Sequence, residues 1–132
     1  LFDPKESIDF NGNTGPFIQY THARIKSILR KNKLELKIDK DLKLSLKEKE
    51  LIKLILDFPK LVQESASSFS PAIIANYVFE LVKEFNSYYQ STTILKADKD
   101  EVISFRVSLA KKTAYIIEKG MSLLGVSVPE RM

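Results

Sequence analysis

The stretch "TGPFIQYTHARIKSILRK", residues 14–31, shows most clearly how the chain folds. Pro16 suits the first turn of a helix, because the backbone N–H that proline lacks has no partner there. Thr14 or Gly15 precedes it and can cap the helix start. We therefore expect a helix from Pro16 to about Lys31.

One face of this predicted helix is aliphatic. With Phe17 as origin and about 100° per residue, Ile18, Ile25 and Leu29 lie at about 80° to 120°. This spacing predicts that the three side chains face a core. His22 falls at the edge of the same stripe, at about 140°. We expect it to be a structural, hydrogen-bonding histidine rather than a ligand or an acid.

A second face carries rings and a guanidinium group. Tyr20 and Arg24 lie at about −60° and −20°, beside Phe17. Flat rings stack on unpaired bases, and a guanidinium group binds phosphates or base edges, so this stripe is a candidate RNA-binding surface. The alternative, favoured by periodicity alone, is that the rings pack on another helix while Arg24 extends from the rim.

The next helix is expected to begin near Leu46. Ser45 and Glu48 form a capping-box pattern, and an apolar face follows them. Pro59 should interrupt this helix, because proline removes a backbone donor. A short helix over 60–67 can follow.

Two further helices are predicted after residue 69. Ser70 and Pro71 form a cap followed by a first-turn proline, and the apolar period continues to about Tyr89. Asp98 with Glu101 should start the last helix, and Gly120 should end it.

The remaining segments lack a helical period. Residues 1–15 are expected to be a connecting loop, because 11–15 are rich in turn-forming residues. Residues 32–46 alternate apolar and polar positions, which fits either an extended linker or a short hairpin, and we favour the linker. The predicted fold is all-α, a single helical bundle of about four or five helices.

Composition excludes most catalytic chemistry. The 132 residues include one histidine and no cysteine, so disulfides and thiolate sites cannot form. No Gly-rich phosphate loop, nucleophile set or metal-ligand pattern occurs, and we expect neither a catalytic nor a metal site. No apolar run approaches the ~20 residues of a membrane span, and no signal peptide is recognisable, so we expect a cytoplasmic protein without membrane contact.

Positive charge is concentrated in one part of the sequence. The net charge is +4, but residues 24–47 hold nine Lys or Arg and three acidic residues. A basic zone of this kind can attract RNA, although a solvated lysine-rich surface explains it equally well.

Three separated segments resemble arginyl-tRNA synthetases, a family of class I enzymes. They are "FDPKESIDFNGNTGPFIQYTHARIKSILRK" (2–31), "FNSYYQ" (85–90) and "GMSLLGVSVPERM" (120–132). The match runs in the order of that family's C-terminal part and spans nearly the whole chain. Neither the Asp-Ala-Leu-Arg motif that names its anticodon-binding domain nor the class I catalytic signatures occur in this sequence.

The resemblance implies how the chain is divided and which functions belong to the rest of the parent enzyme. Residues 1–15 would be the seam to a catalytic domain that this chain lacks, and 16–132 the all-α anticodon-binding domain. The parent enzyme would be an arginine–tRNA ligase that uses ATP with magnesium, whereas this chain alone would hold no cofactor. Its partner would be the anticodon stem-loop of arginine tRNA, bound by a monomer.

The resemblance also implies which residues bind the anticodon. Phe17, Tyr20, Tyr89 and Met132 match positions that surround splayed anticodon bases in this family. A tyrosine is common where Phe17 stands, and phenylalanine keeps the stacking surface but has no hydroxyl for a hydrogen bond. Backbone groups near Ala23 would help to read a central cytosine. Further candidates for base edges or phosphates are added on their chemistry: Gln19, Arg24, Arg106 and Arg131.

A function of a different class is also consistent with the residues. The chain could be a non-catalytic helical module whose rings dock on another protein. Replacing Tyr20 or removing Met132 would then leave RNA affinity unchanged.

Overall fold

The computed structural model describes residues 3–7 and 14–132, and helices dominate them. No strand occurs within these residues, which confirms the all-α prediction. Four of the helices are long and one is a single turn. Their bounds are α1 Pro4–Ser7, α2 Gly15–Lys31, α3 Leu46–Ser67, α4 Pro71–Ser91 and α5 Asp100–Leu123.

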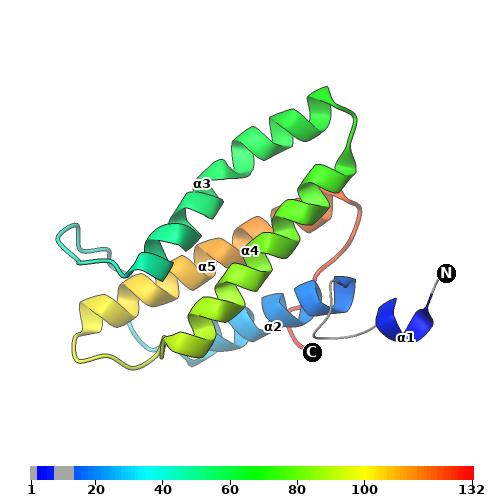
Figure 1. Ribbon diagram of the computed structural model, residues 1–132. Coiled ribbons are helices and arrows are strands. Elements are labelled where there is room, and N and C mark those ends of the chain that lie inside the picture. Colours follow the sequence, from blue (N-terminus) through cyan, green and yellow to red (C-terminus); the bar gives the residue numbers. More distant parts are fainter. Residues whose placement is uncertain (1–2, 8–13) are drawn as a thin grey trace.

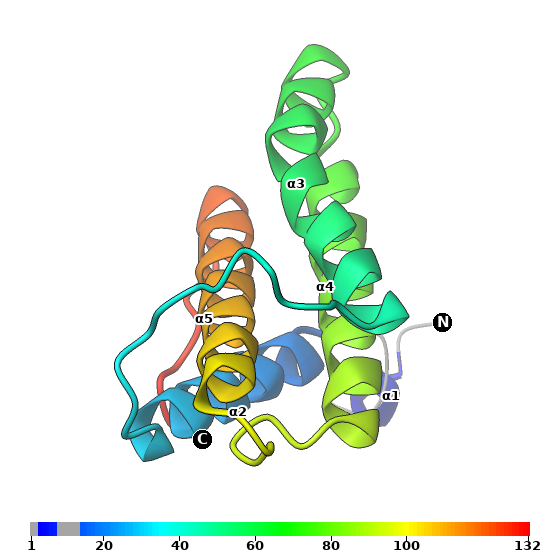
Figure 2. The same cartoon turned by 90° about the vertical axis from the view of Figure 1, so that its left-hand side faces the viewer.

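Three long helices run alongside one another, and the fourth crosses them (Figure 1). In Figure 2, α3, α4 and α5 stand roughly upright, while α2 lies across their lower end. α3 packs mainly on α4, and α2 and α4 both pack on α5. The core lies where these helices meet, and its largest fully buried side chains include Tyr88, Phe85, Ile25, Leu51, Leu81 and Ile117.

The first long helix follows its sequence pattern closely. Thr14 is the cap, and its hydroxyl oxygen accepts a hydrogen bond of 3.3 Å from the backbone N–H of Phe17. Ile18 and Ile25 are buried, as the aliphatic stripe predicts. His22 is 1% exposed and hydrogen-bonds to backbone, so its predicted structural role is confirmed.

The segment between α2 and α3 is an extended linker, as we expected, and not a hairpin. It runs past α5, where Ser104 holds it (Figure 2). The backbone N–H of Lys37 donates to the Ser104 hydroxyl at 2.6 Å, and that hydroxyl donates to the Lys37 carbonyl at 2.7 Å. The linker ends at the predicted capping box of α3, in which Ser45 and Glu48 each accept the other's backbone N–H.

The prediction that Pro59 interrupts the third helix is wrong, because α3 continues through Pro59 to Ser67. Contacts with α4 support α3 beside the proline. The Phe58 ring stacks on Tyr77 of α4, with 5.6 Å between ring centroids. The Tyr77 hydroxyl donates to the Leu54 carbonyl at 2.7 Å. Packing against α4 just before the proline therefore accompanies a continuous helix despite the local cost of ~3 kcal/mol.

The start of the fourth helix is as predicted. α4 begins at Pro71, directly after Ser70, although the Ser70 side chain makes no capping hydrogen bond. The helix ends at Ser91, two residues beyond the expected end at Tyr89.

Both predicted ends of the last helix are wrong. α5 begins at Asp100 after the backbone of Lys99, and Asp98 does not cap it. The helix also continues through Gly120 to Leu123. Gly120 is buried at a close helix crossing, where an added Cβ would overlap Val78 Cγ2 of α4.

The glycine that ends α5 is Gly125. It has a φ of +74°, and its N–H donates to the Ser122 carbonyl at 3.0 Å. The N–H of Val126 donates to the Met121 carbonyl at 3.0 Å. This pair of bonds is a Schellman motif, which a left-handed glycine favours.

The prediction of a connecting loop over residues 1–15 needs one correction. Residues 4–7 form the single helical turn α1, whose first residue is the favourable Pro4. The rest of that prediction falls largely on residues 1–2 and 8–13, which lie outside the described residues. No helix of the described chain is both long enough and apolar enough to span a bilayer.

Candidate nucleic-acid interface

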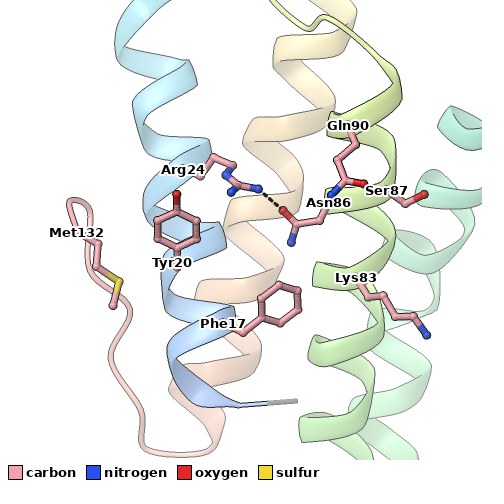
Figure 3. Close-up of a pocket in the computed structure, with 8 residues that line it drawn as sticks. All are labelled: Phe17, Tyr20, Arg24, Lys83, Asn86, Ser87, Gln90 and Met132. Carbon is pink, nitrogen blue, oxygen red and sulfur yellow. Dashed lines mark hydrogen bonds between the residues drawn. The ribbon is translucent and has the colours of Figure 1, made fainter. Parts of the chain in front are cut away.

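Two adjoining pockets lie between α2, α4 and the last residues of the chain, and we call them together the aromatic groove. Figure 3 shows the residues that line the first pocket: Phe17 and Arg24 of α2 extend toward α4, and Met132 lies beside Tyr20. Its volume is about 750 Å³. Both pockets share Tyr20, Arg24 and Met132. The first adds Phe17, Lys83, Asn86, Ser87 and Gln90, and the second adds Ala23, Ser27, Arg30, Tyr89 and Arg131.

Arg24 occupies the centre of the groove and is fixed there. Its guanidinium carbon lies 4.8 Å from the centroid of the Tyr20 ring and 5.2 Å from that of Tyr89. Its Nη1 donates a 2.6 Å hydrogen bond to the side-chain oxygen of Asn86 on α4 (Figure 3). The guanidinium group is therefore held between two rings while part of it still faces the pocket.

The aromatic residues of the groove differ in how much surface they present. Tyr20 and Tyr89 are 38% and 39% exposed. Tyr89 stacks on the buried Phe85 ring, with 6.4 Å between centroids. Phe17 is half-buried against Phe79 of α4, at 5.9 Å and a tilt of 58°. Phe17 thus joins the core with one face, whereas the two tyrosines present half-exposed rings.

The groove is electropositive. Among the described residues that line it, Arg24, Arg30, Lys83 and Arg131 are cationic and none is acidic. A surface of this kind attracts a phosphate backbone, and neighbouring rings offer stacking surfaces for bases.

The basic zone of the sequence is divided by the fold. Of residues 24–47, only Arg24 and Arg30 among the cations line the aromatic groove. Linker residue Lys43 instead lies in a different pocket near the start of α5, together with Asp41 and Asp98. The positive charge counted over residues 24–47 is therefore not gathered on one surface of the folded chain.

The last residues of the chain complete the groove by folding back onto α2. Arg131 and Met132 are exposed and line it. Ala23 is buried and lines the same pocket, as expected for a small residue beside a crossing segment. Gln19 does not line the groove. Its amide Nε2 donates to the Ser127 carbonyl at 2.9 Å, so it holds the returning segment.

Arg106 is placed away from the groove, on α5. Its Nη1 donates to the Thr93 carbonyl at 3.0 Å, and its Nε lies 3.6 Å from Glu48 Oε1. Glu48 is buried and accepts a 3.1 Å hydrogen bond from the Tyr88 hydroxyl. Burial, with the nearby Glu48 charge, raises the pKa of Tyr88, so its hydroxyl stays protonated and donates.

Four groove residues on α4 were not predicted as site residues: Lys83, Asn86, Ser87 and Gln90. Their spacing of three, one and three residues places them on one helical face, and this is the signal that the sequence offered. Asn86 also stands four residues after Val82, so it is a polar residue within an apolar stripe. Only the packing of α4 beside α2 connects this face to Arg24.

No group of three or more His, Asp or Glu side chains in the described part of the chain is arranged to hold a metal ion. The groove itself offers rings, amides and cations, which are groups that can contact bases and phosphates.

Nearly the whole chain is similar to known proteins. The profile of the family described as "DALR anticodon binding domain" matches residues 18–132. The arginine–tRNA ligase of Flavobacterium psychrophilum is 53% identical over 132 residues, which is 100% of this chain and 22% of that protein. The chain thus spans less than a quarter of this curated relative.

Solved structures agree with the sequence comparison. Thermus thermophilus arginyl-tRNA synthetase matches with a TM-score of 0.92 and 33% identity, over 99% of this chain and 23% of that one. Arginyl-tRNA synthetase from Plasmodium falciparum matches with a TM-score of 0.85 and 30% identity, over the same shares. The four long helices and their packing are therefore shared with these proteins.

Proposed function

This chain belongs to the DALR anticodon-binding domain family, and we propose that it recognises the anticodon stem-loop of arginine tRNA as part of an arginine–tRNA ligase. The observation that carries the proposal is the fixed guanidinium group of Arg24 between the half-exposed rings of Tyr20 and Tyr89. Anticodon bases are unpaired, so their faces and edges can enter such a groove.

In the proposed complex, the parts of the groove have separate tasks. Tyr20 and Tyr89 stack on splayed bases, and Met132 packs on the opposite side. Arg131 and Lys83 bind phosphates. Sequence readout comes from Arg24 and from backbone groups near Ala23, while Phe17 lines the groove and packs on Phe79 of α4.

Two further candidates, Gln19 and Arg106, take indirect tasks in this proposal. Gln19 holds the returning end of the chain through Ser127. Arg106 braces α5 against Glu48 and the Thr93 carbonyl. Both assignments follow because neither residue lines the groove.

The reaction itself belongs to the parent enzyme in this proposal. An arginine–tRNA ligase joins arginine to its tRNA with ATP, and we assign ATP and magnesium to a catalytic domain outside this chain. We place the enzyme in the cytoplasm, where tRNA is charged, and expect a monomer. The alternative of a protein-docking module is not favoured, because the family profile is that of an anticodon-binding domain.

The test compares two stem-loops. The anticodon stem-loop of arginine tRNA should bind more tightly than the same stem-loop with its central cytosine replaced by guanine. Dissociation constants at moderate salt measure the difference. Equal binding of both would contradict sequence readout.

A matched pair of variants tests the stacking surface. Tyr20→Ala should weaken binding about tenfold, because stacking on one ring contributes ~1–3 kcal/mol and ~1.4 kcal/mol is a factor of ten. Tyr115→Ala is the control, since Tyr115 is also half-exposed and lies beside two lysines, but outside the groove. It should leave affinity unchanged. A similar loss in both variants would argue against the groove.

A further inference from the structure

The segment after α5, residues 126–132, returns to α2 and is held there by side chains from four positions of that helix. We call this segment the tail. The α2 residues follow one another at intervals of three, four and four, so they form one row on the helix surface. The contacts are Gln19 Nε2 to the Ser127 carbonyl at 2.9 Å, His22 Nδ1 to the Pro129 carbonyl at 2.8 Å, Lys26 Nζ to Glu130 Oε1 at 3.0 Å and Arg30 Nη1 to the Glu130 carbonyl at 3.0 Å.

Three of these contacts reach backbone carbonyl oxygens of the tail. Backbone contacts fix the position of a segment along the helix whatever its side chains are. The sequence of the tail can therefore change at Ser127 and Pro129 while its register is kept.

His22 is the most constrained member of the row. A carbonyl oxygen only accepts, so the Nδ1 of His22 carries the proton that reaches Pro129. Its Nε2 is buried with no hydrogen-bond partner among the described residues. The ring therefore makes a single polar contact, which goes to the tail, and an unpartnered buried nitrogen costs stability. Its placement is better explained by the tail than by core packing alone.

The row lies on a different side of α2 from the aromatic stripe. With Phe17 as origin, the row is centred at about 180° and the stripe of Phe17, Tyr20 and Arg24 at about −30°. Ala23, at about 240°, lies between them. The tail is thus held on one side of the helix and crosses over Ala23 before Arg131 and Met132 enter the groove.

We propose that Gln19, His22, Lys26 and Arg30 form a tail clamp, a set of positioning residues that sets the register of residues 127–130 and so holds Arg131 and Met132 in the groove. The proposal rests on the proposed function in one respect, because it makes RNA affinity depend on the clamp. A shift of the tail by one residue would remove Met132 from its place opposite Tyr20. The clamp thereby makes RNA recognition depend on Gln19, His22 and Lys26, which do not line the groove.

The clamp can be tested without RNA. The chain has two methionines, so methyl labelling gives two NMR signals, Met132 in the groove and the buried Met121 as internal reference. In the double variant Gln19→Ala, Lys26→Ala, the Met132 methyl should become more mobile while the Met121 methyl is unchanged. Both replaced side chains are at least partly exposed, so the fold should survive. The matched control Lys60→Ala, Gln63→Ala changes the same residue types on an exposed face of α3 and should leave both methyls unchanged.

His22 is tested by a pair of variants with different donors. His22→Leu removes the donor to Pro129 and should mobilise Met132. His22→Asn keeps an N–H near the Nδ1 position and should restore much of its order. Equal mobility in the two variants would contradict the assigned hydrogen bond.

RNA binding then tests the coupling. The Gln19→Ala, Lys26→Ala variant should weaken binding of the arginine anticodon stem-loop about fivefold, as expected for losing hydrogen bonds of this kind. The same substitutions should have no further effect in a chain that lacks residues 131–132, because the clamp acts only through them. Arg30 is left unchanged, since it also lines the groove.

Two outcomes would overturn the proposal. One is an unchanged Met132 methyl in the clamp variants, and the other is a loss of RNA affinity that persists in the shortened chain. If the unaltered chain does not bind the stem-loop, the proposed function fails, and the methyl measurements alone decide whether the clamp holds the tail.

Discussion

Arg24 of α2 and Asn86 of α4 are joined by a 2.6 Å hydrogen bond across the seam between their helices. Asn86 is buried, and its amide nitrogen donates to Thr21 Oγ1 at 2.8 Å and to the Val82 carbonyl at 3.0 Å. These bonds leave the amide oxygen directed at Arg24. The guanidinium group is thus oriented before any ligand arrives, which lowers the entropy lost on binding.

For stem-loop affinity, the orientation of the Arg24 side chain should matter more than its charge. Arg24→Lys keeps the positive charge but loses the planar fork that reaches Asn86 and lies over two rings. We expect stem-loop affinity to fall about fivefold with an unchanged salt dependence. Lys83→Ala is the contrasting variant, and it should lower the slope of log K against log salt by about 0.7, the value for one phosphate contact. If Arg24→Lys binds RNA with unchanged affinity, the charge of Arg24 alone explains its contribution to binding.

Local sequence signals predicted the helices well where no other helix intervened. The cap at Thr14 and the capping box at Ser45 act within a few residues, so they can be recognised in one dimension. Pro59 and Gly120 were misread for the opposite reason. Each usually ends a helix, but here α4 packs against both places and changes the outcome.

Gly120→Ala should destabilise the protein, although alanine is the better helix former by about 1 kcal/mol. The new Cβ would overlap Val78 Cγ2, and Val78 is fully buried and short, so it cannot move aside. We expect the free energy of unfolding to fall by about 1–3 kcal/mol, the usual range for overpacking. Urea denaturation measures it, and a gain in stability would show that α4 and α5 can separate without cost.

Pro59→Ala should have the opposite effect. It restores a backbone donor within α3, while the Phe58–Tyr77 stacking and the Tyr77 bond to Leu54 remain. Part of the gain is cancelled because alanine gives the unfolded chain more freedom. The free energy of unfolding should rise by about 1–2 kcal/mol. Lys60→Ala, at the next exposed position, is the control and should change stability by less than about 0.5 kcal/mol.

The candidate site could be predicted only where its residues share one helix. Phe17, Tyr20 and Arg24 form a visible stripe because their spacing follows the helical period. The contribution of Asn86 depends on how α2 lies beside α4, and no local pattern contains that relation. The path of the tail over Ala23 also has no local pattern that predicts it. It follows from the turn at Gly125 and from four contacts to α2.

Arg106 should prove to be a stabilising residue. Arg106→Met removes the charge beside buried Glu48 and the donor to the Thr93 carbonyl. We expect the free energy of unfolding to fall by about 1–3 kcal/mol, because Glu48 loses a partner in a buried position. The salt dependence of stem-loop binding should not change. Normal stability together with a smaller salt slope would instead assign Arg106 to a phosphate.

Docking of the tail should weaken in acid. Hydrogen bonding and charge attraction from Lys26 hold the pKa of Glu130 below its ordinary value of 4.5. A carboxyl group with a lowered pKa favours the docked state while it is ionised, so its contribution is complete above the ordinary pKa. The contribution is lost as the pH falls from about 4.5 through the lowered value. Between pH 6 and 8 the Lys26–Glu130 pair should cause no change in the docking of the tail.

The mobility of the Met132 methyl measures this dependence. It should increase as the pH falls below about 4.5, but only in part, because the other three contacts of the tail do not involve the Glu130 carboxylate. In Glu130→Gln, the Met132 methyl should already be partly mobile at neutral pH, and its mobility should not change across the acid range. Glu50→Gln, an exposed glutamate of α3, is the matched control and should behave like the unaltered chain. An acid transition that survives in Glu130→Gln would mean that another carboxyl group governs the tail, and the assigned pair with Lys26 would then be wrong.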